Sequence, residues 1–478
     1  MSDSTRDNVI RSVDTSAGRL ERLACDIWQH PETGFHEEHA TGLIMSVLEE
    51  AGFSLARGVA GIPTAFIAEW GSGRPVIGVL GEYDALPGLS QKVSATREPL
   101  QPGAPGHACG HNLLGVGSLG AVLAARTAMG ASGLTGIVRY YGCPAEETLM
   151  GKVFMAREGA FDDLDVALTW HPMYPNTLWS ASSAALNSFK LGFHGVSAHA
   201  GSAPEAGRSA LDAVILTDVG VNYLREHVPG NVRIHCVITD GGEAPNIVPA
   251  FARSWYYVRA PDREQVRAVY ERVLDVARGA ALMTDTRLEV EFVAGCYDFL
   301  ANSTAEKVLL SNMKSLGPPA FSAADFEFAA ALVRTLPEGA ADEAAKSFGL
   351  TREGPGDVLC TSISDSVNGL AAGQVQPVST DLGDVSRIVP TAQMTACCVP
   401  LGVPLHSWQA VASCGSHIGL AAVPFVAKSL GLTVVDLMTR PGTLEAAREE
   451  HVRSTGGCAY TCPLPPQARL PVIRREER

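Results

Sequence analysis

The sequence contains a short segment, GHACGHN at residues 106–112, in which two histidines flank one cysteine. A cysteine thiolate and an imidazole are ligands that suit borderline divalent metals such as zinc. The same residues could also form a redox loop or a tight turn, because glycine permits unusual backbone angles and buried free cysteines are common. Partners elsewhere in the chain must decide between these interpretations.

Polar side chains also follow three apolar segments that are typical of buried strands. These are Glu82 and Asp84 after residues 76–81, Glu146 and Glu147 after residues 137–142, and His171 at the end of residues 164–171. The carboxyl ends of parallel strands share one edge of an open sheet, and ligands bind at that edge. We therefore expect these side chains to converge beside the GHACGHN segment.

The combined residue types favour a pair of metals over a single one. Cys109, His111, Glu147, His171 and one further donor would supply sulfur, nitrogen and oxygen ligands, which suit two divalent ions, manganese or zinc. Five or six ligands exceed the needs of one tetrahedral metal and favour two metals about 3.5–4 Å apart, which together activate water and polarise a carbonyl. One of the two adjacent glutamates would bind metal, and its neighbour would carry a proton from water to a leaving amine.

Each residue has a plainer interpretation when it is taken alone. A single histidine is more often structural than a ligand, and paired glutamates after a strand usually begin a helix, where the helix dipole favours them. Only their placement together makes the metal site the better hypothesis. The adjacent Cys397 and Cys398 could form a redox pair, although two buried cysteines are the better interpretation.

The segments between these residues predict an α/β fold with a mostly parallel sheet. Amphipathic helices are expected at residues 14–29 and 37–51, a mostly apolar helix at 113–130, and another helix at 146–159. Strands and helices alternate along this half of the chain, which is typical of βαβ units.

The pattern changes at about residue 186. From there to residue 300 the predicted order is β-α-β-β-α-β, the ferredoxin-like arrangement. We therefore expect a metal-binding catalytic domain formed by residues 1–185 and 301–478, interrupted by a smaller α+β lid domain at residues 186–300.

Composition narrows the classes of partner. The chain has 478 residues and a formal net charge of −14, which argues against nucleic acid or an anionic membrane as the main partner. The N-terminus has no apolar signal segment, and no apolar run is expected to span a bilayer. Eleven scattered cysteines suit a reducing compartment better than a disulfide framework. We expect a cytoplasmic protein that acts on a small molecule.

Several longer motifs occur in a fixed order that resembles a known family. They are GEYDALPG, GHACGHNLLGVG, GCPAEE, GVSAHAGSAPEAGRSALDA, GGEAPNIVP and PLHSWQ. Together they resemble the dinuclear metal amidohydrolases of the aminoacylase/carboxypeptidase G superfamily. Within it they are similar to the auxin-conjugate amidohydrolases and, in that branch, to the type represented by the B subunit of p-aminobenzoyl-glutamate hydrolase. The resemblance covers roughly residues 15 to 465, and it implies a catalytic domain interrupted by a lid that forms a homodimer.

The resemblance also implies roles for individual residues. It implies five metal ligands, namely Cys109, His111, Glu147, His171 and His406. Cys109 would lie between the metals, with Glu147 and His406 on one metal and His111 and His171 on the other. His107 corresponds to a histidine that is not a ligand.

The remaining implied roles concern catalysis and substrate binding. By the resemblance, Glu146 is the general acid/base and Asp84 is the aspartate that orients the metal ligands. In the lid, His199 would reach the partner subunit's active site and stabilise the oxyanion. Asn246 would bind substrate, and Arg259 would help to bind a substrate carboxylate.

The sequence departs from the family pattern at two places. Glu82 stands where more distant relatives carry a histidine, so that His111 would have to take over its role. Asn112 replaces an aspartate that is usual in the auxin-conjugate enzymes. The segment STDLGDVSRIVPT at residues 379–391 also resembles the aminobenzoyl-glutamate branch, but neither Asp384 nor Ser386 receives a role from it.

The resulting expectation is metal-dependent hydrolysis of an amide bond between an acyl or aroyl group and an amino acid. A dipeptidase or an aromatic-amine deaminase would use the same site chemistry. A non-catalytic partner of a related subunit is a further alternative, and a redox role for Cys109 is a weaker one.

Overall fold

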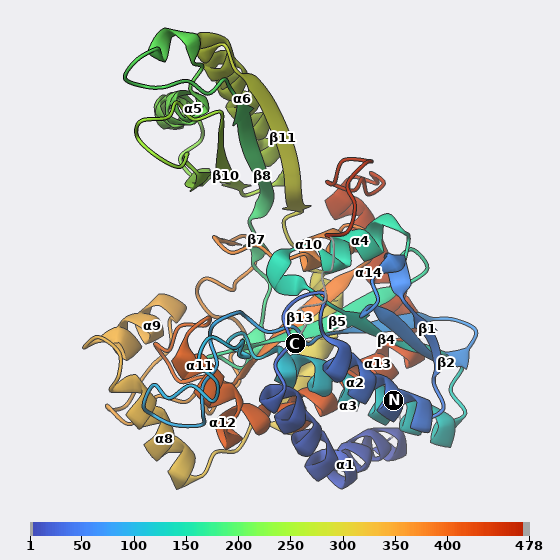
Figure 1. The fold of residues 1–478 in the computed structure, drawn as a ribbon. Coiled ribbons are helices and arrows are strands. Elements are labelled where there is room, and N and C mark those ends of the chain that lie inside the picture. Colours follow the sequence, from blue (N-terminus) through green and yellow to red (C-terminus); the bar gives the residue numbers. More distant parts are fainter. Residues whose placement is uncertain (1–2, 472–478) are drawn as a thin grey trace.

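The computed structural model describes residues 3–471 (Figure 1). Its larger part is built on a seven-stranded sheet in the order β1-β2-β4-β3-β5-β13-β6. The four central strands run parallel, and they are β4 (Gly136–Cys143), β3 (Val76–Glu82), β5 (Val166–Met173) and β13 (Thr391–Cys397). The outer strands run antiparallel to their neighbours, and they are β1 (Ser54–Arg57), β2 (Phe66–Ser72) and β6 (Thr177–Leu178). The expected α/β class is confirmed, with antiparallel strands at both edges of the sheet.

Apolar helices bury the central strands. Every residue of β3 is buried, as expected for a strand that is covered on both faces of a parallel sheet. The helices α1 (Asp3–Gln29), α3 (His111–Ser132) and α13 (Ala422–Thr439) pack against one another and against the sheet. The remaining helix before β1 is α2 (Glu38–Glu50).

Two of these helical segments correct an expectation from the sequence. Residues 111–132 and 417–439 are long and apolar enough to cross a membrane by length and composition, whereas no such run was expected. In each case 78% of the tested window is buried inside the fold. Both segments therefore act as core helices here, which explains why they are apolar on all sides.

The helix expected at residues 146–159 is interrupted. The chain forms a short turn, η2 (Glu146–Thr148), and then a separate helix, α4 (Gly151–Arg157). Leu149 has a left-handed backbone with φ of 59°, which an α-helix does not accept. The helix expected at residues 113–130 instead begins at His111 and ends at Gly133, whose φ is 61°.

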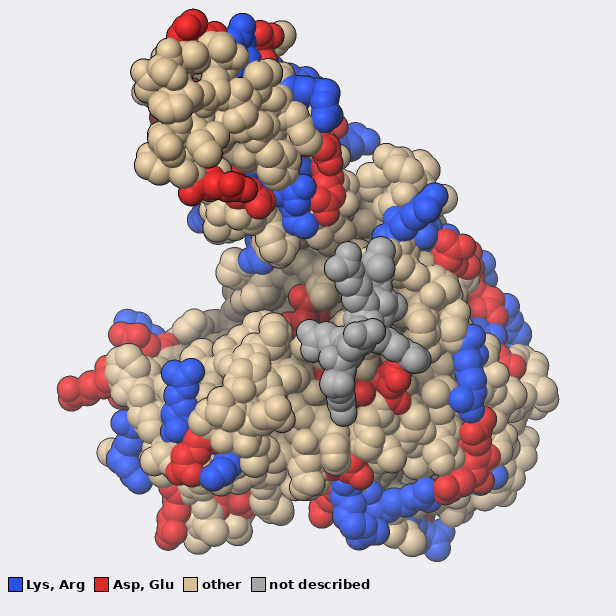
Figure 2. Space-filling model, viewed as in Figure 1, with Lys and Arg blue, Asp and Glu red and all other residues tan. Residues whose placement is uncertain are grey.

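The chain between residues 185 and 296, here called the inserted domain, forms a second sheet. Its elements are β8 (Ala185–His194), α5 (Ala210–Leu224), β9 (Arg233–Asp240), β10 (Phe251–Ala260), α6 (Arg263–Thr284) and β11 (Arg287–Cys296). The sheet is antiparallel throughout, in the order β11-β8-β10-β9, which confirms the expected ferredoxin-like arrangement. The inserted domain projects from the larger part of the molecule (Figure 1), and the surface between them is hollowed (Figure 2).

The remaining elements belong to both parts of the molecule, and those at residues 204–206 and 225–227 lie in the inserted domain. These elements are η1 (Val59–Gly61), β7 (Ser182–Ser183), η3 (Pro204–Ala206), η4 (Arg225–His227), α7 (Ser303–Leu316), α8 (Ala323–Val333), α9 (Ala340–Phe348), β12 (Val375–Gln376), α10 (Leu382–Ser386), α11 (Trp408–Cys414), α12 (His417–Leu420) and α14 (Pro441–Thr455). All eleven cysteines lie within residues 3–471, and each has a free thiol. Cys397 and Cys398 are both buried at the end of β13, as the simpler interpretation expected.

Candidate metal centre

The carboxyl ends of the central strands converge on one cluster of side chains. β3 leads to Glu82 and Asp84, the turn after β4 carries Glu146 and Glu147, and β5 carries His171. Cys109 lies in the loop before α3, and His111 is the first residue of that helix. His406 enters from the segment between β13 and α11.

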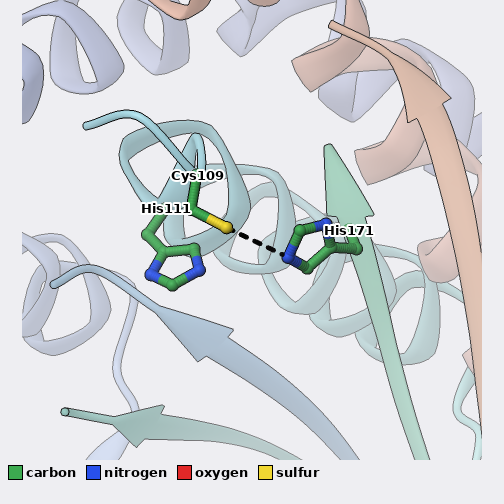
Figure 3. Close-up of side chains that lie close together, drawn as sticks. All are labelled: Cys109, His111 and His171. Atoms are coloured by element: carbon green, nitrogen blue, oxygen red, sulfur yellow. Dashed lines mark hydrogen bonds between the residues drawn. The ribbon is translucent and has the colours of Figure 1, made fainter. Parts of the chain in front are cut away.

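The first group within the cluster consists of Cys109, His111 and His171 (Figure 3). The Sγ atom of Cys109 lies 3.5 Å from Nε2 of His171. Nδ1 of His171 lies 2.9 Å from the carbonyl oxygen of Pro172, so that this nitrogen donates and Nε2 keeps its lone pair toward Cys109. Gly110, with φ of 75°, makes the turn that brings Cys109 and His111 to the same side.

Asp84 orients two members of the cluster at once. Its Oδ1 atom lies 2.9 Å from Nδ1 of His111, and its Oδ2 atom accepts the backbone N–H of Glu147 at 2.9 Å. In the neutral imidazole that a metal ligand requires, Nδ1 of His111 donates to Asp84 and its Nε2 atom carries the lone pair. That Nε2 atom lies 3.4 Å from Glu82 and 4.0 Å from Glu146 and has no hydrogen-bond partner among the described residues.

The second group consists of Cys109, Glu147 and His406. Nε2 of His406 lies 3.4 Å from Oε2 of Glu147, whose other oxygen is buried without a hydrogen-bond partner in the described chain. The backbone of His406 is left-handed, with φ of 62°, and its N–H donates to the carbonyl oxygen of Ala108 at 3.0 Å. Strained backbone of this kind is typical of functional sites, because surrounding contacts must hold it in place.

These residues fit divalent cations. In each of the two groups the ligand atoms lie within 4.8 Å of one another, and Cys109 belongs to both groups. Buried polar atoms without a hydrogen-bond partner, such as Nε2 of His111 and Oε1 of Glu147, are energetically costly, and a cation would satisfy both of them. The mixture of thiolate, imidazole and carboxylate suits a borderline metal such as zinc or manganese.

Burial also shapes the protonation of the cluster. It raises the pKa of Glu147 to about 7 and raises the pKa of Glu146, which the nearby Glu82 raises further. Burial lowers the pKa of His171 to about 4, so that its imidazole is neutral at pH 7, as a metal ligand must be. Burial likewise lowers the pKa of His107 to about 3. A cation in this cluster would favour the ionised carboxylates that burial disfavours.

The three residues of the inserted domain that were expected to serve catalysis and substrate binding lie away from the metal cluster of the same chain. His199 is exposed, and its Nδ1 atom accepts the N–H groups of Gly201 and Ser202 at 3.1 Å. Asn246 is also exposed. It lies beside His199, since the backbone carbonyl oxygen of Asn246 accepts the N–H of Ala200. Arg259 donates to the carbonyl oxygen of Pro377 at 3.3 Å. Among the described residues, no hydrogen bond or ion pair of His199, Asn246 or Arg259 reaches the metal cluster.

The structure also brings residues to the cluster that the sequence did not single out. Lys152 is fully buried with its Nζ atom 2.7 Å from Oε1 of Glu82, and it also pairs with Asp381. Glu37 is buried and accepts the N–H of Ala145 at 2.8 Å, and burial raises its pKa to about 8. A lysine directly before the apolar residues 153–156 was the signal available for Lys152.

Comparison with known proteins shows which class of enzyme the chain is similar to. A model of the M20 peptidase dimerisation domain matches residues 183–283. The chain is 39% identical to the B subunit of p-aminobenzoyl-glutamate hydrolase of Escherichia coli over 462 residues, which cover 95% of this chain and 96% of the relative. It is 29% identical to the Xaa-Arg dipeptidase of Mus musculus, with 92% and 90% of the two chains covered.

Two solved structures share the fold. An aminobenzoyl-glutamate utilization protein from Klebsiella pneumoniae has a TM-score of 0.56 at 20% identity and covers 88% of this chain and 97% of its own. A dinuclear metal-binding peptidase of the M20 family from Bacillus subtilis has a TM-score of 0.55 at 18% identity, with 88% and 99% covered.

The fold and the cluster therefore define a metal-dependent amidohydrolase, an enzyme class that cleaves amide bonds between acyl or aroyl groups and amino acids. With 39% identity over nearly its whole length to one member, the chain belongs to the M20 peptidase family.

Proposed function

We propose that this protein hydrolyses the amide bond of an aroyl- or acyl-amino acid, with an aroyl-glutamate as the first candidate substrate. The observation that carries the proposal is the cluster itself, in which five ligand-type side chains form two groups that share Cys109, and one of them, His111, lies 4.0 Å from the proton-carrying candidate Glu146. The identity to one subunit of an aminobenzoyl-glutamate hydrolase supports the choice of substrate.

The residues divide into two ligand sets around a shared thiolate. Cys109, Glu147 and His406 would hold one cation, and Cys109, His111 and His171 would hold the other. Two divalent cations, manganese or zinc, would lower the pKa of a bound water and polarise the amide carbonyl. Asp84 keeps His111 in the tautomer that leaves Nε2 free and also fixes the backbone of Glu147.

Glu146 is the proton carrier in this proposal. It is nearly buried beside the cluster, and burial raises the pKa of its carboxyl group. A raised pKa makes a carboxylate a better base near neutral pH, so that Glu146 takes a proton from the attacking water. The same carboxyl group then protonates the amine as the amide bond breaks.

The inserted domain would complete the site from outside. We assign residues 1–185 and 301–478 to metal binding and residues 186–300 to a lid that forms a homodimer. His199 of the partner subunit would stabilise the oxyanion, and Asn246 and Arg259 would contact the substrate. The exposed positions of His199 and Asn246 suit such a role.

A related partner chain is an alternative arrangement to the homodimer. The A subunit of the Escherichia coli p-aminobenzoyl-glutamate hydrolase matches 59% of the chain at 26% identity, so two related chains occur in one relative. In either arrangement we place the enzyme in the cytoplasm.

A substrate panel tests the proposal. Protein loaded with manganese or zinc is incubated with p-aminobenzoyl-glutamate, hippurate, an Xaa-Arg dipeptide and an aminobenzoate, and the products are separated by chromatography. Release of glutamate from the first substrate is expected. Intact substrates throughout, in protein that contains metal, would rule out the proposed hydrolysis.

A dipeptidase is the second candidate function. The similarity to Xaa-Arg dipeptidase over 92% of the chain favours it, and the same metal cluster would serve it. Preferential cleavage of the Xaa-Arg dipeptide would select this function. Release of ammonia from the aminobenzoate would select a deaminase instead. The presence of Glu146 together with the full ligand set argues against a non-catalytic partner.

A further inference from the structure

The turn that carries Glu146 and Glu147 is held in an unfavourable backbone conformation. Ala145 and Leu149, on either side of the two glutamates, both have left-handed backbones, with φ of 57° and 59°. Residues with a β-carbon rarely adopt this conformation, so the surroundings must hold the turn in place. Gly151, which follows the turn, lies so close to Pro144 that a β-carbon would lie 1.7 Å from the Pro144 carbonyl oxygen.

Two buried carboxylates hold this turn through its backbone, and a third holds the start of α4 just after it. Glu37 accepts the N–H of Ala145 at 2.8 Å, and Asp84 accepts the N–H of Glu147 at 2.9 Å. Asp381 accepts the N–H of Lys152 at 2.8 Å. The three acceptors come from three separate segments of the chain. Their convergence fixes the turn and the start of α4 relative to the sheet.

Asp381 also reaches the cluster through a second route. Its Oδ1 atom pairs with Nζ of Lys152, which donates to Oε1 of Glu82 at 2.7 Å. The other oxygen of Glu82 lies 3.4 Å from Nε2 of His111. A continuous series of buried polar contacts, here called the Asp381–Lys152–Glu82 chain, therefore runs from α10 to the metal cluster.

The helix that supplies Asp381 is itself firmly placed. Asp384 in α10 accepts the N–H of Tyr297 at 3.0 Å, and Ser386 accepts the N–H of Leu300 at 2.9 Å. At Gly383 a β-carbon would lie 2.1 Å from the Tyr297 carbonyl oxygen, so only glycine allows this approach. The segment 379–391 is thus fixed against the chain where it returns from the inserted domain.

Stability alone is a poor reason for such an arrangement. Burying charges costs free energy, and apolar side chains of similar volume are often as stabilising as a buried ion pair. The Lys152 ammonium group is directed at Glu82, the carboxylate nearest Nε2 of His111, so this buried pair adjoins the metal cluster.

We propose that Asp381 and Lys152 are positioning residues that set the place of the Glu146–Glu147 turn and of the Glu82 carboxylate, and that the segment 379–391 serves to supply Asp381. This inference rests on the proposed metal-dependent function. Neither residue touches substrate. Both act by keeping Glu147 and His111 where the two ligand sets can close around cations.

Electrostatics alone and the proposed positioning role predict opposite effects of Lys152→Gln on cation binding. Lys152→Gln removes a positive charge beside the cluster, which by electrostatics alone would tighten cation binding. If Lys152 positions the turn and Glu82, the same change weakens cation binding. The double variant Lys152→Gln/Asp381→Asn leaves the net charge unchanged, so any loss that it shows arises from position.

The test compares this double variant with a matched one elsewhere in the chain. Lys428 pairs with Asp14 between α13 and α1, so Lys428→Gln/Asp14→Asn removes a lysine–aspartate pair outside the site. Both full-length variants are titrated with Mn²⁺ and Zn²⁺ by calorimetry, and the visible absorption of the Co²⁺-loaded proteins is recorded. Thermal unfolding reports whether each variant is folded.

We expect the site variant to bind metal about 10- to 100-fold more weakly and to show altered Co²⁺ absorption bands. Its kcat should fall with little change in KM, while the control variant behaves like wild type. Wild-type metal affinity and Co²⁺ bands in the folded site variant would overturn the proposal. So would tighter metal binding by Lys152→Gln.

Two further comparisons cover a double variant that does not fold and a wild-type protein that hydrolyses no amide. If the double variant does not fold, Asp381→Asn, which keeps the shape of the side chain, is measured in the same way, and wild-type values there overturn the proposal. If wild type hydrolyses no amide, the proposed function fails. The calorimetry and the Co²⁺ bands still judge the positioning role separately.

Discussion

Nδ1 of His111 and Oδ1 of Asp84 lie 2.9 Å apart, and both side chains are fully buried. This single hydrogen bond decides which imidazole nitrogen faces the metal cluster. Because Asp84 also accepts the N–H of Glu147, one carboxylate orients a ligand in each of the two proposed sets. The geometry of the whole centre therefore depends on a residue that is itself not in either ligand set.

We predict that Asp84→Asn weakens metal binding about 10- to 100-fold, a typical loss when a residue that orients a metal ligand is changed. The asparagine amide can donate to Nδ1 of His111, which would move the imidazole proton to Nε2 and block that ligand atom. Titration with Zn²⁺ measures the effect. Asp275→Asn, at an exposed aspartate, is the control. Unchanged affinity would contradict the assigned role of Asp84.

Replacement of Glu146 by glutamine should separate catalysis from metal binding. We expect a loss of about 10²- to 10⁴-fold in kcat, the usual contribution of a general acid/base, with unchanged metal content. Kinetics and elemental analysis of the same preparation check both expectations. Glu158→Gln, at an exposed position beyond α4, should remain fully active. A Glu146→Gln enzyme with normal turnover would exclude this residue as the proton carrier.

The two proposed ligand sets predict distinct single variants. His171→Asn should reduce the bound metal by one cation per chain, because His171 belongs only to the set with His111. His406→Asn should do the same for the set with Glu147. The double variant should lose more metal than either single variant. Equal metal content in wild type and in both single variants, measured after dialysis, would reject the assignment.

Glu306 predicts a pH effect outside the metal centre. Burial raises its pKa from 4.5 to about 7, with one oxygen bonded to the Ser180 hydroxyl and the other without a hydrogen-bond partner in the described chain. A carboxyl group with a raised pKa in the folded state stabilises that state below about pH 4.5 and loses this contribution as pH rises through about 7. Glu306→Gln should therefore match wild type at pH 4.

At pH 8 the same variant should be more stable by up to about 3 kcal/mol, since wild type must bury an ionised carboxylate there. Urea unfolding of metal-free protein at both pH values measures the difference. Glu327→Gln, at an exposed glutamate, should have little effect at either pH. A destabilised Glu306→Gln at pH 8 would show that the carboxylate is ionised and favourably bound.

Much of the centre was predictable because it depends on local patterns. Apolar segments followed by Glu82, Glu146 and His171 predicted strand ends at one sheet edge, and the observed strands end at or near those residues. The ferredoxin-like order of residues 186–300 was likewise predicted from the local sequence patterns of its strands and helices. Only the family resemblance pointed to His406, and the structure brings its side chain within 3.4 Å of the carboxylate of Glu147.

The rest depends on contacts between distant segments. Lys152 and Asp381 are separated by 229 positions, and no local pattern links a lysine in one helix to an aspartate before another. The break at Leu149 was missed because the residues themselves are good helix formers, and tertiary contacts override that preference. The sequence did predict a mostly apolar helix at residues 113–130, but not that residues 111–132 and 417–439 are both long and apolar enough to cross a membrane.

The place where the inserted domain joins the larger part has a consequence for how such a molecule can change over evolution. The Ser183 hydroxyl accepts the N–H of Phe299 at 3.1 Å, so the segment that enters the inserted domain and the segment that leaves it lie side by side. A segment whose two ends meet can be lengthened, replaced or lost without changing the strand order of its host. The strands that carry the hydrolytic centre can therefore keep their places while the inserted domain changes, and with it the residues that it would contribute to substrate binding.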